Sequence, residues 1–197
     1  MEAKLQPTDV LTPDARLSFP SLFVATTTLD SKVPKFSCTL LLPPDTDLKP
    51  FKIALKRAAV EEWGEKIPPA LKLSLHACET YPYPNGRYAG YDDGWHFIRC
   101  SSKYRAPIVN RGNIPVTDEE QVYPGMWVRA LVNAYAWVHP SGGRGVSFGL
   151  KAIQLVRDGE RLDGRVDAAN VFTPLEDLGD AGEQSDGDDA GLGDMFA

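Results

Sequence analysis

The sequence lacks any apolar run close to the roughly 20 residues that a membrane-spanning helix needs. Its first residues, 1–7, contain no apolar signal core, so we expect a protein that is neither secreted nor membrane-bound. Cysteine is scarce as well. Cys38, Cys78 and Cys100 are odd in number and widely spaced, which argues against a disulfide framework and favours a reducing compartment.

Recognisable catalytic and metal-binding motifs are also missing. The His and Cys residues lack paired zinc-ligand spacing, and no Ser or Cys lies in a known nucleophile motif. The glycine-rich segment 141–149 matches neither the P-loop nor the dinucleotide fingerprint and fits a hairpin turn. Acidic residues at 92–93 and 118–120 suit solvated loops better than a catalytic site. The sequence therefore predicts a binding protein without cofactor or metal, and no enzyme.

Basic residues are absent from the last 25 positions. Segment 173–197 holds eight acidic side chains, whereas the rest of the chain carries all 21 basic residues and the other 19 of the 27 acidic ones. The formal net charge of −6 thus combines a slightly basic body with an acidic tail that is predicted to be disordered. Because such a tail imitates a polyanion, we expect the body to bind one. The alternative is a solubilising extension.

The sequence of the body predicts many strands and one helix. Segment 47–64 has apolar residues at helical spacing, a Pro in its first turn and Gly64 at its end. Strands are predicted at 15–25 (bent), 35–42, 95–103, 127–138 and 146–157. Long loops separate them, which favours a small antiparallel barrel or sandwich. We divide the chain into a flexible arm (1–14), one domain (15–172) and the tail (173–197).

The predicted strand 127–138 has two unlike faces. Its even positions are all small and apolar, as in a core-facing strand. The odd positions fall on the opposite face, which should meet water. They are Trp127, Arg129, Leu131, Asn133, Tyr135 and Trp137.

The predicted strand 95–103 repeats this mixture. Trp95, Phe97, Arg99, Ser101 and Lys103 share one side of it. Bases stack on flat rings with about 1–3 kcal/mol each, and Arg or Lys meets the phosphates, so such a face suits unpaired nucleic acid. The competing interpretation is that these aromatic residues cover a second core.

Two loops offer further candidates. Four tyrosines at positions 81, 83, 88 and 91 lie near Arg87 in a loop rich in Pro and Gly, where they either stack bases or pack against one another. Arg144, in the glycine-rich turn, is placed where it would touch a phosphate.

Four stretches, 16–23, 35–43, 88–107 and 123–160, resemble a family of tailed-phage single-stranded DNA-binding proteins. The resemblance implies an OB-fold-like antiparallel five-stranded barrel that binds single-stranded DNA with little sequence preference. It also implies a role in phage DNA replication, recombination or repair in the cytoplasm of the infected host. The candidate DNA-binding residues are Tyr88, Tyr91, Trp95, Phe97, Arg99, Lys103, Arg105, Trp127, Arg129, Tyr135, Trp137 and Arg144.

The acidic tail resembles those of bacterial and phage single-stranded DNA-binding proteins, although its aromatic residue is penultimate here. We expect it to recruit phage or host replication proteins and to compete with DNA for the body. Its candidate partner-binding residues are Asp186, Asp188, Asp189, Asp194 and Phe196. Two other functions stay open: a virion assembly protein that self-associates through its aromatic face, and a metal-dependent nuclease that uses the acidic loops.

Overall fold

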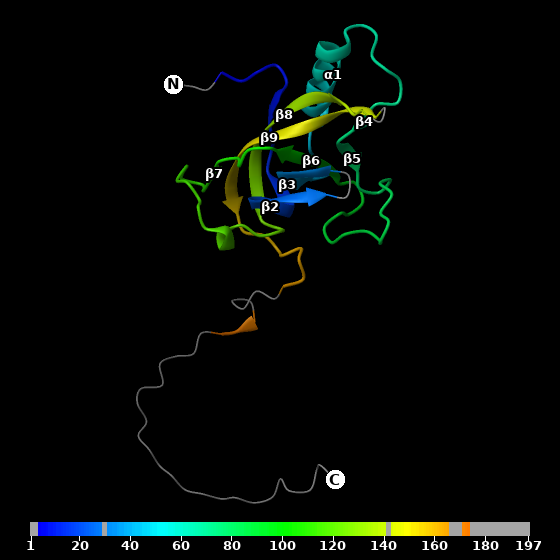
Figure 1. Ribbon diagram of the computed structural model, residues 1–197. Helices are drawn as coiled ribbons and strands as arrows, with labels where there is room; N and C mark the ends of the chain where they lie inside the picture. The colour runs from blue at the N-terminus through cyan, green and yellow to red at the C-terminus, as the bar shows by residue number, and fades with distance from the viewer. Residues whose placement is uncertain (1–3, 29–30, 141–142, 166–170, 174–197) are drawn as a thin grey trace, which may run out of the picture. The chain divides into compact units, whose positions relative to one another are not determined.

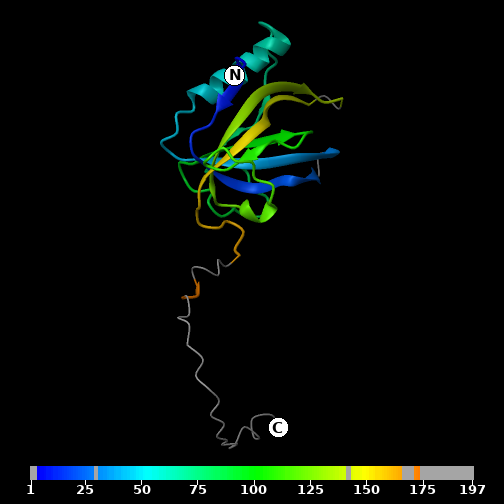
Figure 2. The ribbon, with the colours of Figure 1, turned by 90° about the vertical axis from the view of Figure 1, so that its left-hand side faces the viewer.

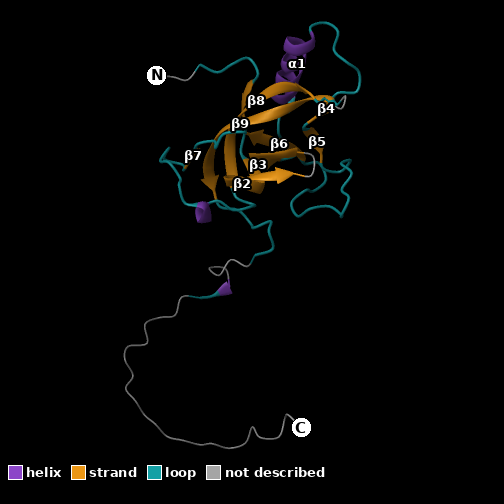
Figure 3. Ribbon diagram, in the orientation of Figure 1, coloured by secondary structure: helices purple, strands orange, loops and turns teal. Residues whose placement is uncertain are grey.

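Figure 1 shows the computed structural model, which describes residues 4–28, 31–140, 143–165 and 171–173. Contacts divide the chain into a compact unit, Met1–Arg165, and a second unit, Val166–Ala197. Strands predominate in the first unit (Figure 3). Its elements are β1 (Asp9–Leu11), β2 (Ala15–Thr28), β3 (Ser31–Leu42), α1 (Lys49–Trp63), β4 (Lys72–Leu73), β5 (Leu75–Ala77), β6 (His96–Ser102), β7 (Ile108–Val109), the 3₁₀ turn η1 (Glu119–Gln121), β8 (Trp127–Val138) and β9 (Arg144–Arg157).

Five long strands form a hydrogen-bonded ring in the order β8–β2–β3–β6–β9, and β9 pairs back onto β8. The junction between β6 and β9 is parallel, with Cys100 opposite Phe148, and the others are antiparallel. The mainly β fold with one main helix is confirmed, and five strands close into a ring, but this ring is not a clean barrel and the expectation of purely antiparallel pairing is wrong. The physical reason is the long crossover from β6 to β8. It brings β8 beside β2, so β9 returns antiparallel to β8 and parallel to β6.

Helix α1 packs into the core of the ring. Phe51, Ala54 and Leu55 are buried, and the Phe51 ring meets the Phe148 ring edge-on with 6.0 Å between centroids. The helix stops at Gly64, whose φ of 61° suits glycine. Both ends lie close to the predicted 47–64. No helix in the described part of the chain is long and apolar enough to cross a membrane.

Strand β8 alternates as its sequence predicts over most of its length. Val128, Ala130, Val132 and Ala134 are buried in the core. Core burial of this side leaves the odd-numbered side chains on the outside of the ring, which we call the outer face. Cys38, Cys78 and Cys100 are buried and unlinked.

The short strand β1 extends the sheet beyond β8. Its residues pair with 131–133, and the Thr8 carbonyl accepts a hydrogen bond from the Ala134 N–H at 2.9 Å. The sequence pattern did not predict this strand, because three residues are too few to show alternation.

Candidate nucleic-acid interface

The odd-numbered side chains of β8 remain accessible on the outer face. Arg129 is exposed, and the other five side chains are half-buried, so none is sealed in the core. A row of aromatic and basic groups therefore lies on the outside of the ring, as the alternation predicts.

The aromatic rings nearest the β8–β9 turn are Tyr135 and Trp137. The Trp137 Nε1–H donates a hydrogen bond to Ser147 Oγ on β9 at 2.9 Å. Its ring lies against Gly145, where an added Cβ would come within 2.8 Å of the indole. These two contacts fix the orientation of the ring. Arg144, next to Gly145, is exposed.

Short side chains line the middle of the outer face. Ser37, Ser101, Gly149 and Asn133 stand opposite one another across β3, β6, β9 and β8. We call these four residues the small-residue row. Arg99, two residues before Ser101, is exposed on the same face. Figure 2 shows the β2–β3 and β8–β9 hairpins projecting in the same direction, with β6 between them. Arg99 and Tyr135 thus lie beside the row on the outer face.

The Trp95 and Trp127 rings form a pair at the other end of β8. Their centroids are 6.3 Å apart with the planes tilted at 45°, and the Arg157 guanidinium lies 4.0 Å from the Trp127 ring centre. Arg129 beside them donates from Nε to Asp14 Oδ1 at 2.6 Å. The Arg157 side chain therefore covers part of the Trp127 ring, and the ion pair with Asp14 partly neutralises the Arg129 charge.

Two candidates are buried instead of exposed. Phe97 is 1% exposed and Tyr91 is 2% exposed, in a second cluster with Leu41 and Cys78. The expectation that these two rings face solvent is wrong. The reason is that the loop after β5 folds over β6 and covers them. The second-core interpretation is correct for these rings, whereas Tyr88, at the edge of the cluster, is half-buried.

Burial disfavours the charged forms of the ionisable groups in and beside this cluster. It raises the pKa of Cys78 to about 11 and that of Tyr83 to about 12, and the Tyr83 hydroxyl donates to the Cys78 carbonyl at 2.9 Å. Burial, with a smaller effect from the Arg99 charge, lowers the pKa of His76. Arg99 itself donates to the Tyr81 hydroxyl at 2.8 Å. The cluster is therefore a neutral support that positions Arg99 at its edge.

Three consecutive exposed residues follow β6: the predicted Lys103 and Arg105, and Tyr104 between them. The Arg105 guanidinium lies 4.5 Å from the centre of the Phe23 ring, while Tyr104 is 83% exposed. Sequence reasoning missed Tyr104, because it lies just beyond the last alternating position. It also missed Arg157. The only signal for either was a single aromatic or basic residue at the end of a strand.

The acidic loops have structural contacts. Asp93 pairs with Arg87 at 2.6 Å, and Asp118 Oδ1 accepts from the Glu120 N–H at the start of η1. Among the residues described, no group of three or more His, Cys, Asp or Glu side chains is placed to hold a metal ion. The tail candidates Asp186, Asp188, Asp189, Asp194 and Phe196 lie outside the described residues.

The structure thus defines a small, mainly β domain with aromatic and basic side chains on one outer face. Over residues 8–186 the sequence matches the family described as "Enterobacter phage Enc34, ssDNA-binding protein". The chain belongs to this family of phage single-stranded DNA-binding proteins. Membership confirms both the resemblance and the prediction of a binding protein that is not an enzyme.

Known relatives share the fold across most of their length. The single-stranded DNA-binding protein of bacteriophage Enc34, crystallised with single-stranded DNA, superimposes with a TM-score of 0.66 at 20% identity over 81% of this chain and 96% of its own. The T7 single-stranded DNA-binding protein gp2.5 gives 0.52 at 12% identity over 81% and 97%. "Putative protein p50" of Acyrthosiphon pisum secondary endosymbiont phage 1 is 29% identical over 157 residues, 77% of this chain and 84% of that protein.

Proposed function

We propose that this protein coats single-stranded DNA during phage DNA replication, recombination or repair in the cytoplasm of the infected host. Bases stack on exposed rings and phosphates pair with Lys and Arg, so binding is largely independent of sequence. The observation that carries the proposal is the placement of Tyr135 and Trp137 on the same outer face as Arg99, across the small-residue row. Family membership and the Enc34 relative crystallised with single-stranded DNA support it.

The candidates divide into direct and supporting roles. Tyr135 and Trp137 are the rings best placed to stack, because they border the row and keep accessible surface. Arg99, Lys103 and Arg144 are the exposed cations available to phosphates. Trp95, Trp127 and Arg129 extend the surface toward the other end of β8, and Tyr88 and Arg105 lie at its margins. Phe97 and Tyr91 support the surface from beneath.

The acidic C-terminal segment has two roles in this proposal. Its carboxylates compete with DNA phosphates for the cations of the outer face, and once DNA displaces it, it recruits replication proteins. The composition supports the competition, since residues 173–197 contain eight acidic and no basic side chains.

One titration tests the function. Labelled poly-dT and a duplex of equal length are added to the protein with and without magnesium, while tryptophan emission is followed. We expect quenching by poly-dT alone, intact DNA, and affinity that falls as salt rises. Self-association without DNA binding would favour the virion assembly function. Magnesium-dependent degradation would favour a nuclease.

A further inference from the structure

The charged side chains at the two ends of α1 are arranged unfavourably for the stability of the helix. Lys49 and Lys52 lie in its first turn, and Glu61 and Glu62 lie in its last. The helix dipole favours acidic residues at the start and basic residues at the end, by about 0.3–1 kcal/mol for each charge. Helix stability therefore does not explain this arrangement.

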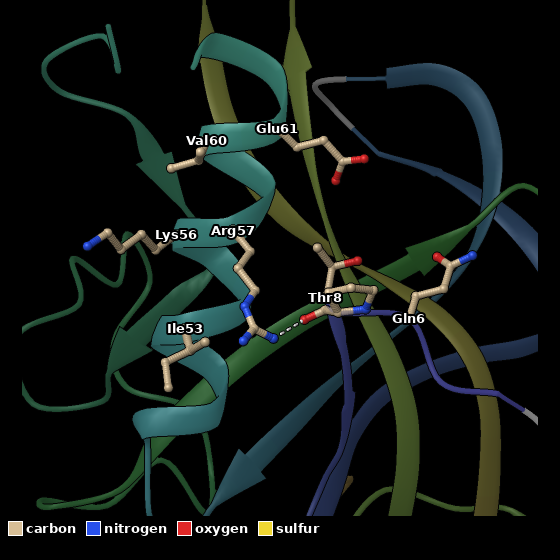
Figure 4. Close-up of a pocket in the computed structure, with 8 residues that line it drawn as sticks. Gln6, Thr8, Ile53, Lys56, Arg57, Val60 and Glu61 are labelled. Carbon is tan, nitrogen blue, oxygen red and sulfur yellow. Dashed lines mark hydrogen bonds between the residues drawn. The ribbon is translucent and has the colours of Figure 1, made fainter. Parts of the chain in front are cut away.

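A groove runs beside the turns of α1 that follow these lysines, from Ile53 to Glu61. It has a volume of about 860 Å³ and lies between α1 and the segment 6–8. Figure 4 shows Ile53, Lys56 and Val60 projecting together from the helix, and Arg57 reaching across to the chain beside Thr8. The Arg57 Nη1 donates to the Pro7 carbonyl at 2.8 Å, which holds the wall of the groove in place.

The groove combines two cations, Lys56 and Arg57, and one carboxylate, Glu61, with exposed apolar surface. Ile53 is 50% exposed and Val60 is 44% exposed. Within the part of the chain that the structure describes, Lys56 forms no ion pair, and neither do Lys49 and Lys52, which precede the groove on the helix. The exposed aliphatic side chains favour a peptide over a nucleic acid, because no aromatic ring lines the groove for a base to stack on. The complementary ligand is an acidic peptide that also carries apolar side chains.

The chain contains one segment with this chemistry. Residues 174–197 hold eight acidic and no basic side chains, and Leu192, Met195 and Phe196 lie among the last of them. Twenty-four residues reach at most about 80 Å when extended, which is enough to span to a neighbouring molecule. We propose that the α1 groove binds residues 174–197 of a second copy of the protein and thereby links copies that are adjacent on one DNA strand.

This linkage rests on the proposed function, because DNA must first displace the acidic segment from the outer face of its own chain. The contact joins two different surfaces, a groove on one copy and a C-terminus on the next. Such a head-to-tail contact continues from copy to copy without closing. It would therefore make coating of a long strand cooperative while leaving the binding of a short oligonucleotide unchanged.

The test uses the full-length protein saturated with short oligo-dT, so that the outer face is occupied. A fluorescein-labelled peptide of residues 174–197 is then added, and its anisotropy is measured. We expect saturable binding that weakens with salt and that falls about fivefold or more in Lys56→Glu and in Ile53→Ser. Lys66→Glu is the matched control, since Lys66 is an exposed lysine that does not line the groove.

Cooperativity gives a second measurement. Lys56→Glu and Ile53→Ser should bind short oligo-dT like the unsubstituted protein but coat long poly-dT less cooperatively. The proposal is overturned if the peptide fails to bind the oligo-saturated protein, or binds both variants as tightly as the unsubstituted one. Failure of the proposed function itself would appear separately, as no oligo-dT binding in the first step.

Discussion

Trp137 is the side chain on which base stacking by this protein most directly depends. Replacing it by Ala should weaken poly-dT binding by about 1–3 kcal/mol, the usual contribution of one stacked base. Trp137→Phe keeps a ring and should lose less. Fluorescence anisotropy with labelled dT measures both. Equal affinity of the Ala variant and the unsubstituted protein would show that the bases do not reach this end of β8.

The contribution of Arg144 to DNA binding can be distinguished from base stacking by the salt dependence of the affinity. If Arg144 contacts a phosphate, Arg144→Gln should reduce the slope of log K against log salt by about 0.7. Lys66→Gln removes an exposed charge beyond α1 and should leave the slope unchanged. The measurement is oligo-dT affinity at several salt concentrations. An unaltered slope in Arg144→Gln would remove this residue from the interface.

At the level of single residues, the sequence predicted most of the outer face and failed where a loop covers it. Trp137 and Tyr135 follow the alternation of β8, which is set by the strand alone. Phe97 follows the same alternation on β6 and yet is buried. Its exposure is decided by the loop after β5, and local periodicity contains no information about where that loop folds.

Among the elements, the β8–β9 hairpin depends on the absence of a side chain at Gly145. An added Cβ there would lie 2.2 Å from the Lys72 carbonyl oxygen on β4 and 2.8 Å from the Trp137 ring. Gly145→Ala should therefore separate β4 from β9, lower the melting temperature and weaken poly-dT binding together. Overpacking of this kind costs about 1–3 kcal/mol.

Gly143→Ala is the matched control in the same hairpin. Its added Cβ would sit 3.7 Å from the Trp137 ring, which is an ordinary contact. We expect thermal unfolding and poly-dT titration to show little change. If Gly145→Ala behaved like this control, the packing of Trp137 against Gly145 would not matter for binding.

The elements themselves differ in how far they could be predicted. Helix α1 and strand β8 are long and strongly periodic, so their residues reveal both ends to within about two positions. Strands β1, β4, β5 and β7 have two or three residues each. They exist because neighbouring strands offer free backbone groups, which is a tertiary cause that leaves no pattern in the sequence.

For the whole molecule, removal of residues 173–197 is the most direct test of competition by the acidic segment. The shortened protein should bind a short oligo-dT more tightly than the full chain at low salt. The difference should shrink at high salt, because screening weakens the attraction between carboxylates and the body. Equal affinities at low salt would refute the competition.

The arrangement of strands was the least predictable property of the whole molecule. A mainly β fold with one helix follows from composition and periodicity. The parallel junction of β6 and β9 depends on which strands meet, and this is settled by contacts between residues far apart in the chain.

The ring closes through a narrow contact between β2 and β8, whose paired residues lie more than 100 positions apart in the chain. Strand β2 meets β8 only where Ala15 faces Val128 and Arg16 faces Trp127. Contacts between residues this far apart in the chain slow folding, because the entropy of closing a long loop opposes them. During synthesis on the ribosome, the outer face is therefore incomplete until β8 and β9 have emerged. Fragments that end before residue 157 should then be unable to compete with the full-length protein for DNA.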